Sequence, residues 1–306
     1  MTSPPKENKR FDGVTLPHRS HARMAFRYLM GNTAAKSGMI IVVVWTLVAV
    51  LAPIIAPVDP NSQNLYNRLQ RPLSRAVKGD TDFIFLLGSD SLGRDLLSRL
   101  IHGAKVSLFV GLASALGSLA IGCLIGALAG YIGGRTDEFL MALCDLQMAF
   151  PAILMALAIM AVLGSGVVNL VIVFTVTGWV QYARTLRAEI LHIKEQDFVK
   201  ASRALGAYPA SIIMRHILPN AFSAILVLFS FQVAQMITME AALSFLGVGV
   251  PPNIPSWGRI LADGREFVYS AMWLSLLPGI CLMSLVAGIY FLGDALRDAL
   301  DPLLAK

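Results

Sequence analysis

Six stretches of this chain are almost free of charge, and most are long enough to cross a lipid bilayer. A membrane-spanning helix needs about 20 mostly apolar residues. The stretches lack the strict alternation of a lipid-facing barrel strand, so helices are expected. They cover residues 39–57, 106–132, 139–163, 167–182, 221–239 and 272–292. The sequence therefore predicts an all-α membrane protein built as a bundle of six transmembrane helices.

Composition excludes a soluble alternative. Only 14% of the 306 residues are charged and 56% are hydrophobic, whereas soluble domains carry about 25% charged residues. A water-soluble core stops growing at about 250–300 residues and cannot bury this much apolar sequence. The three cysteines, Cys123, Cys144 and Cys281, lie in apolar stretches. They predict small packing residues, with no disulfide framework and no zinc site.

Two of the six stretches need a further argument. The first follows a long polar lead, and Pro53 and Pro57 occupy the region where a signal peptide would be cleaved. A retained helix is therefore favoured over a cleaved signal peptide. The fourth stretch is short, and it ends in Trp179 and Tyr182. Their amphipathic rings are typical of a membrane interface, which favours a span that ends there.

The distribution of basic residues predicts which ends lie in the cytoplasm. Lysine and arginine are concentrated in the N-terminal lead and in the loop between the fourth and fifth stretches. Cytoplasmic loops carry such an excess, so with six spans both termini are expected to be cytoplasmic. The loop 58–105 must then lie outside, and it fits this rule poorly because it carries seven basic residues: Arg68, Arg71, Arg75, Lys78, Arg94, Arg99 and Lys105.

Small residues recur at every fourth position in and after the second stretch. They would form one smooth face on a helix, which permits close approach of a neighbouring helix. Packing within the bundle is the favoured interpretation, and contact with a second membrane subunit stays open. The row consists of Ser114, Ser118, Gly122, Gly126, Gly130 and Gly134.

Prolines and acidic residues also interrupt the apolar stretches. Pro151 and the pair Pro278–Gly279 lie inside the third and sixth stretches, where they should kink helices. Asp145 lies inside the third stretch and Glu240 borders the fifth on its outer side. An acid within a span suggests a proton or ion relay. The favoured interpretation is instead that both carboxylates lie near a membrane edge and reach water.

The loop 195–220 has the pattern of two short helices. Asp197 can cap the first helix, and Gly206 stands where a helix ends through a left-handed residue. Pro209 suits the first turn of a second helix, which Pro219 would end before the fifth span begins. One face of the first helix is apolar or small, through residues at helical spacing: Phe198, Ala201, Ser202 and Leu205. Such a face can dock in another protein's groove or lie on the bilayer, and the residues alone leave both open.

The segment from Lys200 to Pro219 resembles the EAA loop of ABC importer permeases. The usual form is E-A-A-x-x-x-G, nine variable residues, then I-x-L-P. This chain has Lys200-Ala201-Ser202, then Gly206, then HILP ending at Pro219, with the spacing intact. Lysine replaces the usual glutamate, serine an alanine and histidine an isoleucine, and the run RHILPN is similar to the variant of the dipeptide, oligopeptide and nickel branch. The segments 88–108, 240–258 and 292–304 resemble the C-type subunit of that branch, and the resemblance covers the chain from about residue 20.

The resemblance implies a type I ABC importer permease bundle with a cytoplasmic coupling helix. In that family two permease subunits form the pore, two ATPase subunits hydrolyse ATP with Mg, and an external binding protein delivers the solute. The implied organisation is a cytoplasmic segment 1–36, a first transmembrane helix 37–57, an external loop 58–105, a core permease domain 106–292 with the coupling loop 195–220, and a cytoplasmic tail 293–306. The B-type permease subunit would complete a heterodimer in the bacterial inner membrane.

The same resemblance assigns roles within the coupling loop. Ala201 and Gly206 would allow close helix packing, and Leu218 and Pro219 would anchor the loop to the fifth span. Ser202 is assigned to the same ATPase-coupling loop. The surface that docks on the ATPase would be formed by Arg203, Tyr208, Pro209, Ala210 and Ser211.

No catalytic machinery is expected in the chain itself. It contains no Gly-Lys dipeptide and hence no G-x-x-x-x-G-K-[ST] phosphate loop, so ATP must be handled by another chain. An intramembrane serine protease would need a G-x-S-G motif and a histidine within a span, and neither occurs. A stand-alone secondary transporter is the remaining alternative, and its paired repeats are not evident. Peptides are the default solute of the branch, with glutathione or a nickel complex left open, and no residue is assigned to solute binding.

Overall fold

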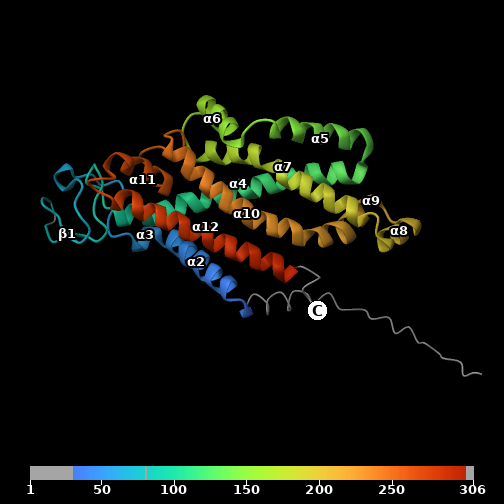
Figure 1. Ribbon diagram of the computed structural model, residues 1–306, viewed down its shortest axis with the longest axis horizontal. Coiled ribbons are helices and arrows are strands. Elements are labelled where there is room, and N and C mark those ends of the chain that lie inside the picture. The colour runs from blue at the N-terminus through green and yellow to red at the C-terminus, as the bar shows by residue number, and fades with distance from the viewer. Residues whose placement is uncertain (1–29, 80, 301–306) are drawn as a thin grey trace, which may run out of the picture.

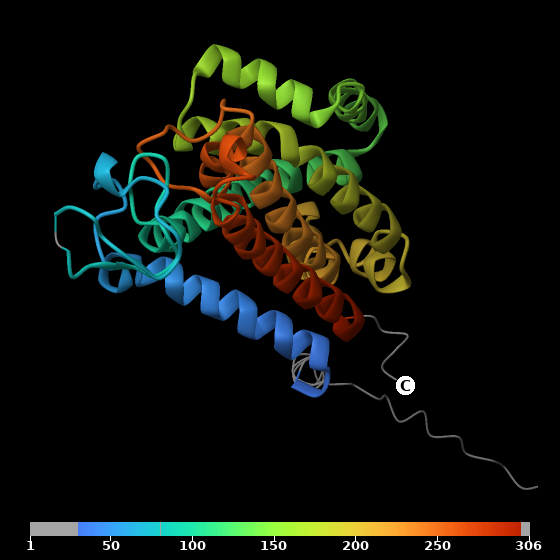
Figure 2. The ribbon, with the colours of Figure 1, turned by 60° about the vertical axis from the view of Figure 1, so that its left-hand side comes forward.

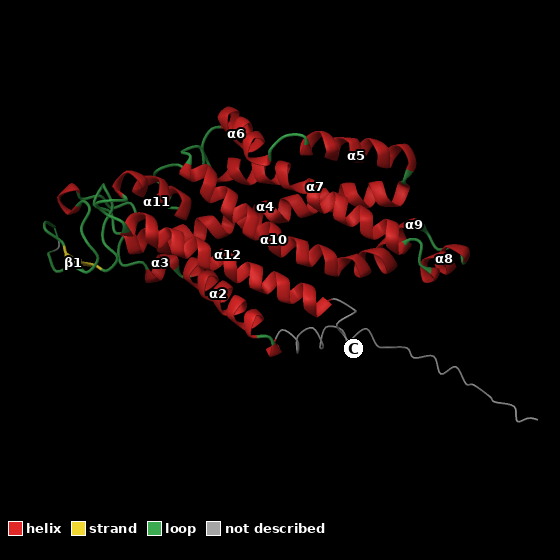
Figure 3. Ribbon diagram, viewed as in Figure 1, coloured by secondary structure: helices red, strands yellow, loops and turns green. Residues whose placement is uncertain are grey.

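The computed structural model describes residues 30–79 and 81–300, and this part of the chain is almost entirely helical (Figure 1, Figure 3). The α-helices are α2 (Thr33–Val50), α3 (Ala52–Ile55), α4 (Leu96–Ile132), α5 (Gly134–Met148), α6 (Ala152–Leu163), α7 (Val167–Ile193), α8 (Asp197–Ala204), α9 (Pro209–Ile212), α10 (Leu218–Phe245), α11 (Trp257–Gly264) and α12 (Trp273–Leu300). The shorter elements are the 3-10 turns η1 (Leu65–Asn67) and η3 (Arg265–Phe267), the π-helical turn η2 (Ile213–Ile217), and the paired antiparallel strands β1 (Ser74–Arg75) and β2 (Ile84–Phe85).

Five of these helices are long and apolar enough to cross a membrane, and the bent pair α5 and α6 makes six if it counts as one span. The five are α2, α4, α7, α10 and α12, which confirms the predicted all-α membrane fold. The fourth span is longer than the sequence predicts, because α7 continues through Trp179 and Tyr182 to Ile193. The Tyr182 side chain is completely buried against α4, so the expected interfacial position of this ring is wrong.

Contacts along α4 show the direction of its neighbours. Gly122 packs on Tyr182 of α7 and Gly130 packs further along on Ile190, so α4 and α7 run parallel. Ser107 contacts Glu240 of α10 while the later residue Gly111 contacts the earlier residue Ile237, so α4 and α10 run antiparallel. Because α4 and α7 are parallel, the intervening pair α5 and α6 must return the chain across the bundle. The bent pair therefore serves as one crossing.

The predicted kink at Pro151 is a complete break between two helices. Residues 149–151 separate α5 from α6, and the two helices differ in direction by 85°. Proline cannot donate a helical hydrogen bond and disfavours helical geometry in the residue before it, which explains a break at this position. Pro278 behaves differently, because α12 runs through it as one helix from Trp273 to Leu300.

The row of small residues on α4 faces α7. A Cβ atom added at Gly126 would lie 2.5 Å from the carbonyl oxygen of Ala183, and one at Gly130 would lie 2.9 Å from Ile190 Cβ. These approaches exclude larger side chains, so α4 and α7 pack closely within one chain. Gly134 does not continue the row. It begins α5 with a φ of +56° and has no atom within 4 Å of an added Cβ, because the chain turns at Gly133 and Gly134.

The elements between the long helices gather at the two ends of the bundle. The loop that carries β1 and β2 lies at one end together with α11, and α8 and α9 lie at the opposite end (Figure 1). The start of α2 and the end of α12 point toward the end that carries α8 (Figure 1). Across the bundle, α2 lies along α12 on one flank and α5 and α6 lie beyond α7 on the other (Figure 2).

Candidate coupling surface

The loop 195–220 folds as the sequence predicts, as two short helices joined at a glycine. α8 begins at Asp197, and Gly206 follows its end with a φ of +79°, the left-handed conformation that favours glycine. The Ala207 amide donates to the Ser202 carbonyl at 3.1 Å, which closes the end of α8. Pro209 is the first residue of α9, where its missing amide hydrogen costs no helical bond.

Buried aliphatic side chains attach these short helices to two long ones. Val199 of α8, Ile212 of α9 and Ile217 of η2 are almost completely buried. They pack with Ile190 of α7 and Ala221 of α10 in one apolar cluster. The loop is therefore packed against the ends of α7 and α10 through this cluster.

The opposite side of the loop is exposed and largely apolar. Leu205 is 88% exposed, Tyr208 is 82% exposed and Phe198 is 42% exposed. Ala201 is exposed as well and Ser202 is partly buried. The apolar face predicted from the sequence therefore points away from the bundle. We name the exposed face formed by Phe198, Ala201, Leu205 and Tyr208 the coupling surface.

The remaining predicted residues of the loop divide into three groups. Ser211 and Leu218 are partly buried, and Leu218 packs on the cluster that holds the loop in place. Gly206 is exposed, and no atom lies within 4 Å of an added Cβ, so close packing at this glycine needs a second chain. The side chains of Arg203, Pro209 and Ala210 lie outside the part of the structure that is described.

Pro219 does not end the second short helix, in contrast to the prediction. α9 continues through the π-helical turn η2 directly into α10, and Leu218 donates its amide to the Ile213 carbonyl. Proline lacks the amide hydrogen that would bond to the Arg215 carbonyl. A widened turn before Pro219 accommodates this loss without breaking the helix. The short helix α9, which directly follows the coupling surface, is thus continuous in backbone with a membrane-spanning helix.

Acidic residues of α5 pair with arginines of α7 near the same end. Asp137 accepts from Arg187 Nε at 2.5 Å and from Arg187 Nη2 at 2.6 Å. Asp145 pairs with Arg184, and both of these side chains are exposed. Asp145 therefore lies at an accessible surface, as expected. The two pairs fasten the otherwise lightly packed α5 to α7.

Glu240 differs from the prediction that it reaches water. Its carboxylate is fully buried and accepts 2.8 Å hydrogen bonds from the hydroxyls of Ser107 and Ser244. The Ser244 hydroxyl in turn accepts from the Val250 amide at 3.1 Å. Glu240 therefore ties α10 to α4 and to the segment that follows α10. The prediction failed because Ser107, one of the two serines that enclose the carboxylate, comes from α4.

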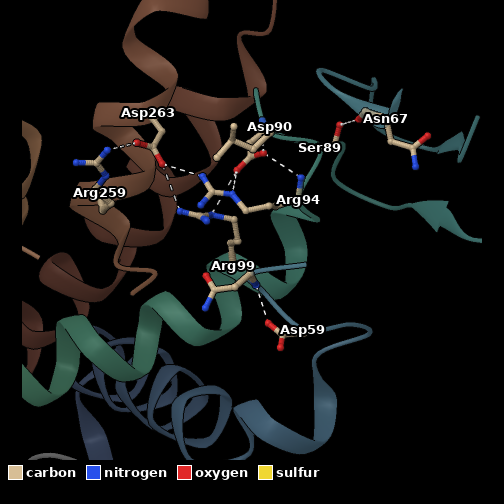
Figure 4. Close-up of polar contacts among 10 residues, drawn as sticks. Asp59, Asn67, Ser89, Asp90, Arg94, Arg99, Arg259 and Asp263 are labelled. Atoms are coloured by element: carbon tan, nitrogen blue, oxygen red, sulfur yellow. Dashed lines mark hydrogen bonds and ion pairs between the residues drawn. The ribbon is translucent and has the colours of Figure 1, made fainter. Parts of the chain in front are cut away.

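A buried ion cluster lies at the other end of the bundle and was not predicted. Asp90 accepts from Arg94 Nε at 2.6 Å, and Arg99 Nε lies 3.7 Å from the same carboxylate (Figure 4). The carboxylate of Asp263 in α11 forms ion pairs with the Nη2 atoms of three arginines: Arg94 at 3.1 Å, Arg99 at 3.3 Å and Arg259 at 2.8 Å (Figure 4). The available local signal was the i, i+4 spacing of Arg259 and Asp263 within one helix.

This ion cluster fastens the loop before α4 to α11. Asp95 adds a cap at the start of α4, where it accepts from the Ser98 amide at 2.8 Å and the Ser98 hydroxyl at 2.7 Å. Burial raises the pKa of the Asp95 carboxyl above its ordinary value, because desolvation outweighs these hydrogen bonds. The bundle thus has an anchored end around Asp90 and an end that presents the coupling surface.

Comparison with family models finds two matches. Residues 122–306 match the model described as binding-protein-dependent transport system inner membrane component. Residues 20–72 match the N-terminal TM domain of oligopeptide transport permease C. Together the two models cover α2 and everything from the middle of α4 onward.

Characterised relatives match over nearly the whole chain. The oligopeptide transport system permease protein OppC of Bacillus subtilis is 39% identical over 93% of this chain and 90% of its own length. The di/tripeptide transport system permease protein DppC of Pseudomonas aeruginosa is 41% identical over 89% of each chain. The glutathione transport system permease protein GsiD of Pectobacterium atrosepticum is 36% identical over 91% of this chain and 89% of its own length.

Solved structures share the fold at lower identity. A chain of the MetNI methionine ABC transporter in an inward-facing conformation matches with a TM-score of 0.54 and 20% identity, over 66% of this chain and 96% of that one. A chain of an amino acid ABC transporter matches with a TM-score of 0.52 and 15% identity, over 65% and 92%. The chain therefore belongs to the family of binding-protein-dependent transport system inner membrane components, and it is the permease component of an ABC importer and not itself an ATPase.

Proposed function

We propose that this chain forms half of the pore of an ATP-driven importer that takes up peptides. A second, B-type permease subunit would form the other half, two ATPase subunits would bind ATP and Mg, and an external binding protein would deliver the peptide. The observation that carries the proposal is the coupling surface, an exposed apolar face on helices that are firmly attached to α7 and α10. Such a face suits a groove on a partner protein.

The mechanism follows from how the coupling loop is attached. When ATP binding moves the ATPase subunits, the force enters the chain at Leu205 and Tyr208, in the link between α8 and α9. The buried side chains of Val199 and Ile212 pass this displacement to the ends of α7 and α10. Because packed helices move as rigid bodies, the opposite ends of α7 and α10 shift as well. Access to the pore then alternates between the two sides of the membrane.

The proposed orientation places the coupling surface and both termini in the cytoplasm. The basic residues Arg184, Arg187, Lys194 and Arg215 lie at the end that carries α8, in agreement with the usual cytoplasmic excess. The opposing loop carries basic residues too, but two of them, Arg94 and Arg99, are buried in ion pairs. Most of the basic N-terminal lead precedes residue 30 and lies outside the described residues.

Peptides are the proposed solute because relatives are named for them. The three relatives carry the names of oligopeptide, di/tripeptide and glutathione transport systems, and glutathione is itself a tripeptide. Their identities to this chain are too similar to select one solute length. We therefore propose peptides as the class of solute and do not specify a peptide length.

A tagged version of this chain tests the proposal. Purification from the native host should yield a second permease subunit and ATPase subunits in fixed proportion. Reconstituted with its binding protein, the complex should take up short peptides only while ATP is supplied on the cytoplasmic side. Uptake that continues unchanged after ATP depletion would contradict the proposal. Purification of the chain without any ATPase subunit would contradict it as well.

A further inference from the structure

Four of the seven glutamines of the chain line one cavity inside the bundle. The cavity has a volume of about 320 Å³ and lies between the break of α5 and α6, the middle of α7 and the second half of α10. This volume is at the lower end of that of small-molecule sites, about 300–1,000 Å³. The polar residues in its wall are Gln147, Thr177, Gln181, Gln232 and Gln235. None of the described residues that line it is charged.

Two of the glutamines have a structural explanation. Gln147 donates its amide to the Thr177 carbonyl at 2.8 Å and to the Val176 carbonyl at 3.1 Å. Gln232 donates to the Gly178 carbonyl at 3.3 Å. These bonds fasten α5 and α10 to α7 and shape the wall of the cavity.

The other two glutamines face the cavity with exposed side chains. Gln181 lies in the middle of α7 and Gln235 lies in α10, and both line the cavity. An amide turned toward hydrocarbon loses its hydrogen bonds to water, so polar side chains in membrane spans face water, a partner or a solute. The position of the pair beside a cavity at bilayer depth therefore indicates a polar occupant.

The apolar part of the wall is adaptable. Four methionines line the cavity, from α5, α6 and α10: Met148, Met155, Met236 and Met239. Methionine side chains are flexible and polarizable, so they adjust to side chains of different shape. The wall thus combines fixed amide groups with a surface that discriminates little between apolar groups.

We propose that this cavity is a contact site for the peptide during passage, with Gln181 and Gln235 hydrogen-bonding to its backbone. A glutamine amide both donates and accepts, which matches the N–H and C=O groups of any peptide. The absence of charge from the lining residues fits recognition of the backbone without selection on side-chain charge. The inference rests on the proposed function and specifies where in this chain the solute is held.

The experiment uses the complete transporter in proteoliposomes, with its binding protein and radiolabelled trialanine as the probe. Gln181→Met and Gln235→Met keep the length of the side chain and remove its amide. Loss of one hydrogen bond of this kind should slow uptake about fivefold in each variant, and about 25-fold in the double variant. ATP hydrolysed per peptide taken up should rise by the same factor. Gln235→Asn, which keeps an amide, should restore part of the uptake.

Thr238→Val is the matched control. Thr238 is exposed on the same helix, does not line the cavity and donates its hydroxyl to the Ala234 carbonyl at 2.9 Å. It should transport trialanine at the parent rate. In the glutamine variants, uptake of peptides that carry lysine or glutamate should fall by the same factor as uptake of trialanine, because the contact is to the backbone.

Three outcomes separate the possible failures. If the parent complex shows no ATP-dependent uptake of trialanine, the proposed function fails. If the parent transports and the double glutamine variant matches it in rate and in ATP per peptide, this inference fails while the proposed function stands. If the double variant no longer purifies with the second permease subunit, the glutamines hold a subunit interface, and the inference is overturned.

Discussion

Replacing Leu205 and Tyr208 together by aspartate is expected to abolish ATP-driven uptake while the chain still folds and inserts. Both side chains are more than 80% exposed, so they contribute little to the packing of this chain. In the assembled transporter they would be buried against an ATPase subunit, where a central apolar side chain is worth about 2 kcal/mol or more. Since 1.4 kcal/mol is about tenfold in affinity, the double variant should bind the ATPase subunits about 100-fold or more weakly.

The measurement is co-purification of the ATPase subunits together with uptake in proteoliposomes. Glu195→Gln is the matched control, because Glu195 is exposed just before α8 and pairs with Lys200 away from the coupling surface. It should keep both assembly and transport. A double aspartate variant that retains ATPase subunits and transports at the parent rate would show that this surface does not carry the coupling.

The second large effect is expected at Asp90. Its carboxylate accepts a hydrogen bond from Arg94 Nε and lies 3.7 Å from Arg99 Nε. All three side chains are at most 5% exposed. Asp90→Asn keeps the shape but leaves two buried guanidinium groups short of negative charge. Removing one partner of a buried pair typically costs about 3–5 kcal/mol. The variant should therefore melt at a distinctly lower temperature in detergent and yield less folded protein.

A double variant separates the ion pair from general damage to the loop. Arg94→Met in the Asp90→Asn background removes one of the two buried positive charges that lost a partner and should recover part of the lost stability. Asp59→Asn, at an exposed position of the same loop, is the control and should leave the melting temperature unchanged. Equal losses in the Asp90 and Asp59 variants, or no recovery in the double variant, would contradict this account of the cluster.

Local patterns were sufficient to predict the helices and the coupling loop. The apolar stretches predicted the spans because bilayer thickness sets their length and no water is present to accept backbone hydrogen bonds. The end of α8 and the start of α9 were predictable from Gly206 and Pro209, which act through their own backbone geometry. The resemblance to a known family added the role of the loop, which its amphipathic pattern alone left undecided.

Features that depend on contacts between distant segments were predicted poorly. Glu240 was expected to reach water, but Ser107 lies 133 positions away in sequence and encloses it. Tyr182 was expected at an interface and is instead packed on Gly122 of α4. The ion cluster around Asp90 joins a loop to α11 across more than 160 positions. Hydrophobic periodicity along the sequence does not predict contacts between segments so far apart.

The coupling surface is the centre of this account, and cross-linking tests it most directly. A photoreactive group attached at Leu205→Cys would be compared with the same group at Leu73→Cys. Leu73 is exposed and directly precedes β1, which lies at the opposite end of the bundle (Figure 1). The parent chain with its own three cysteines measures background labelling. In the assembled transporter, Leu205→Cys should link to an ATPase subunit, and Leu73→Cys should not. A Leu205→Cys chain that links to lipid or to the binding protein, and never to an ATPase subunit, would contradict the account.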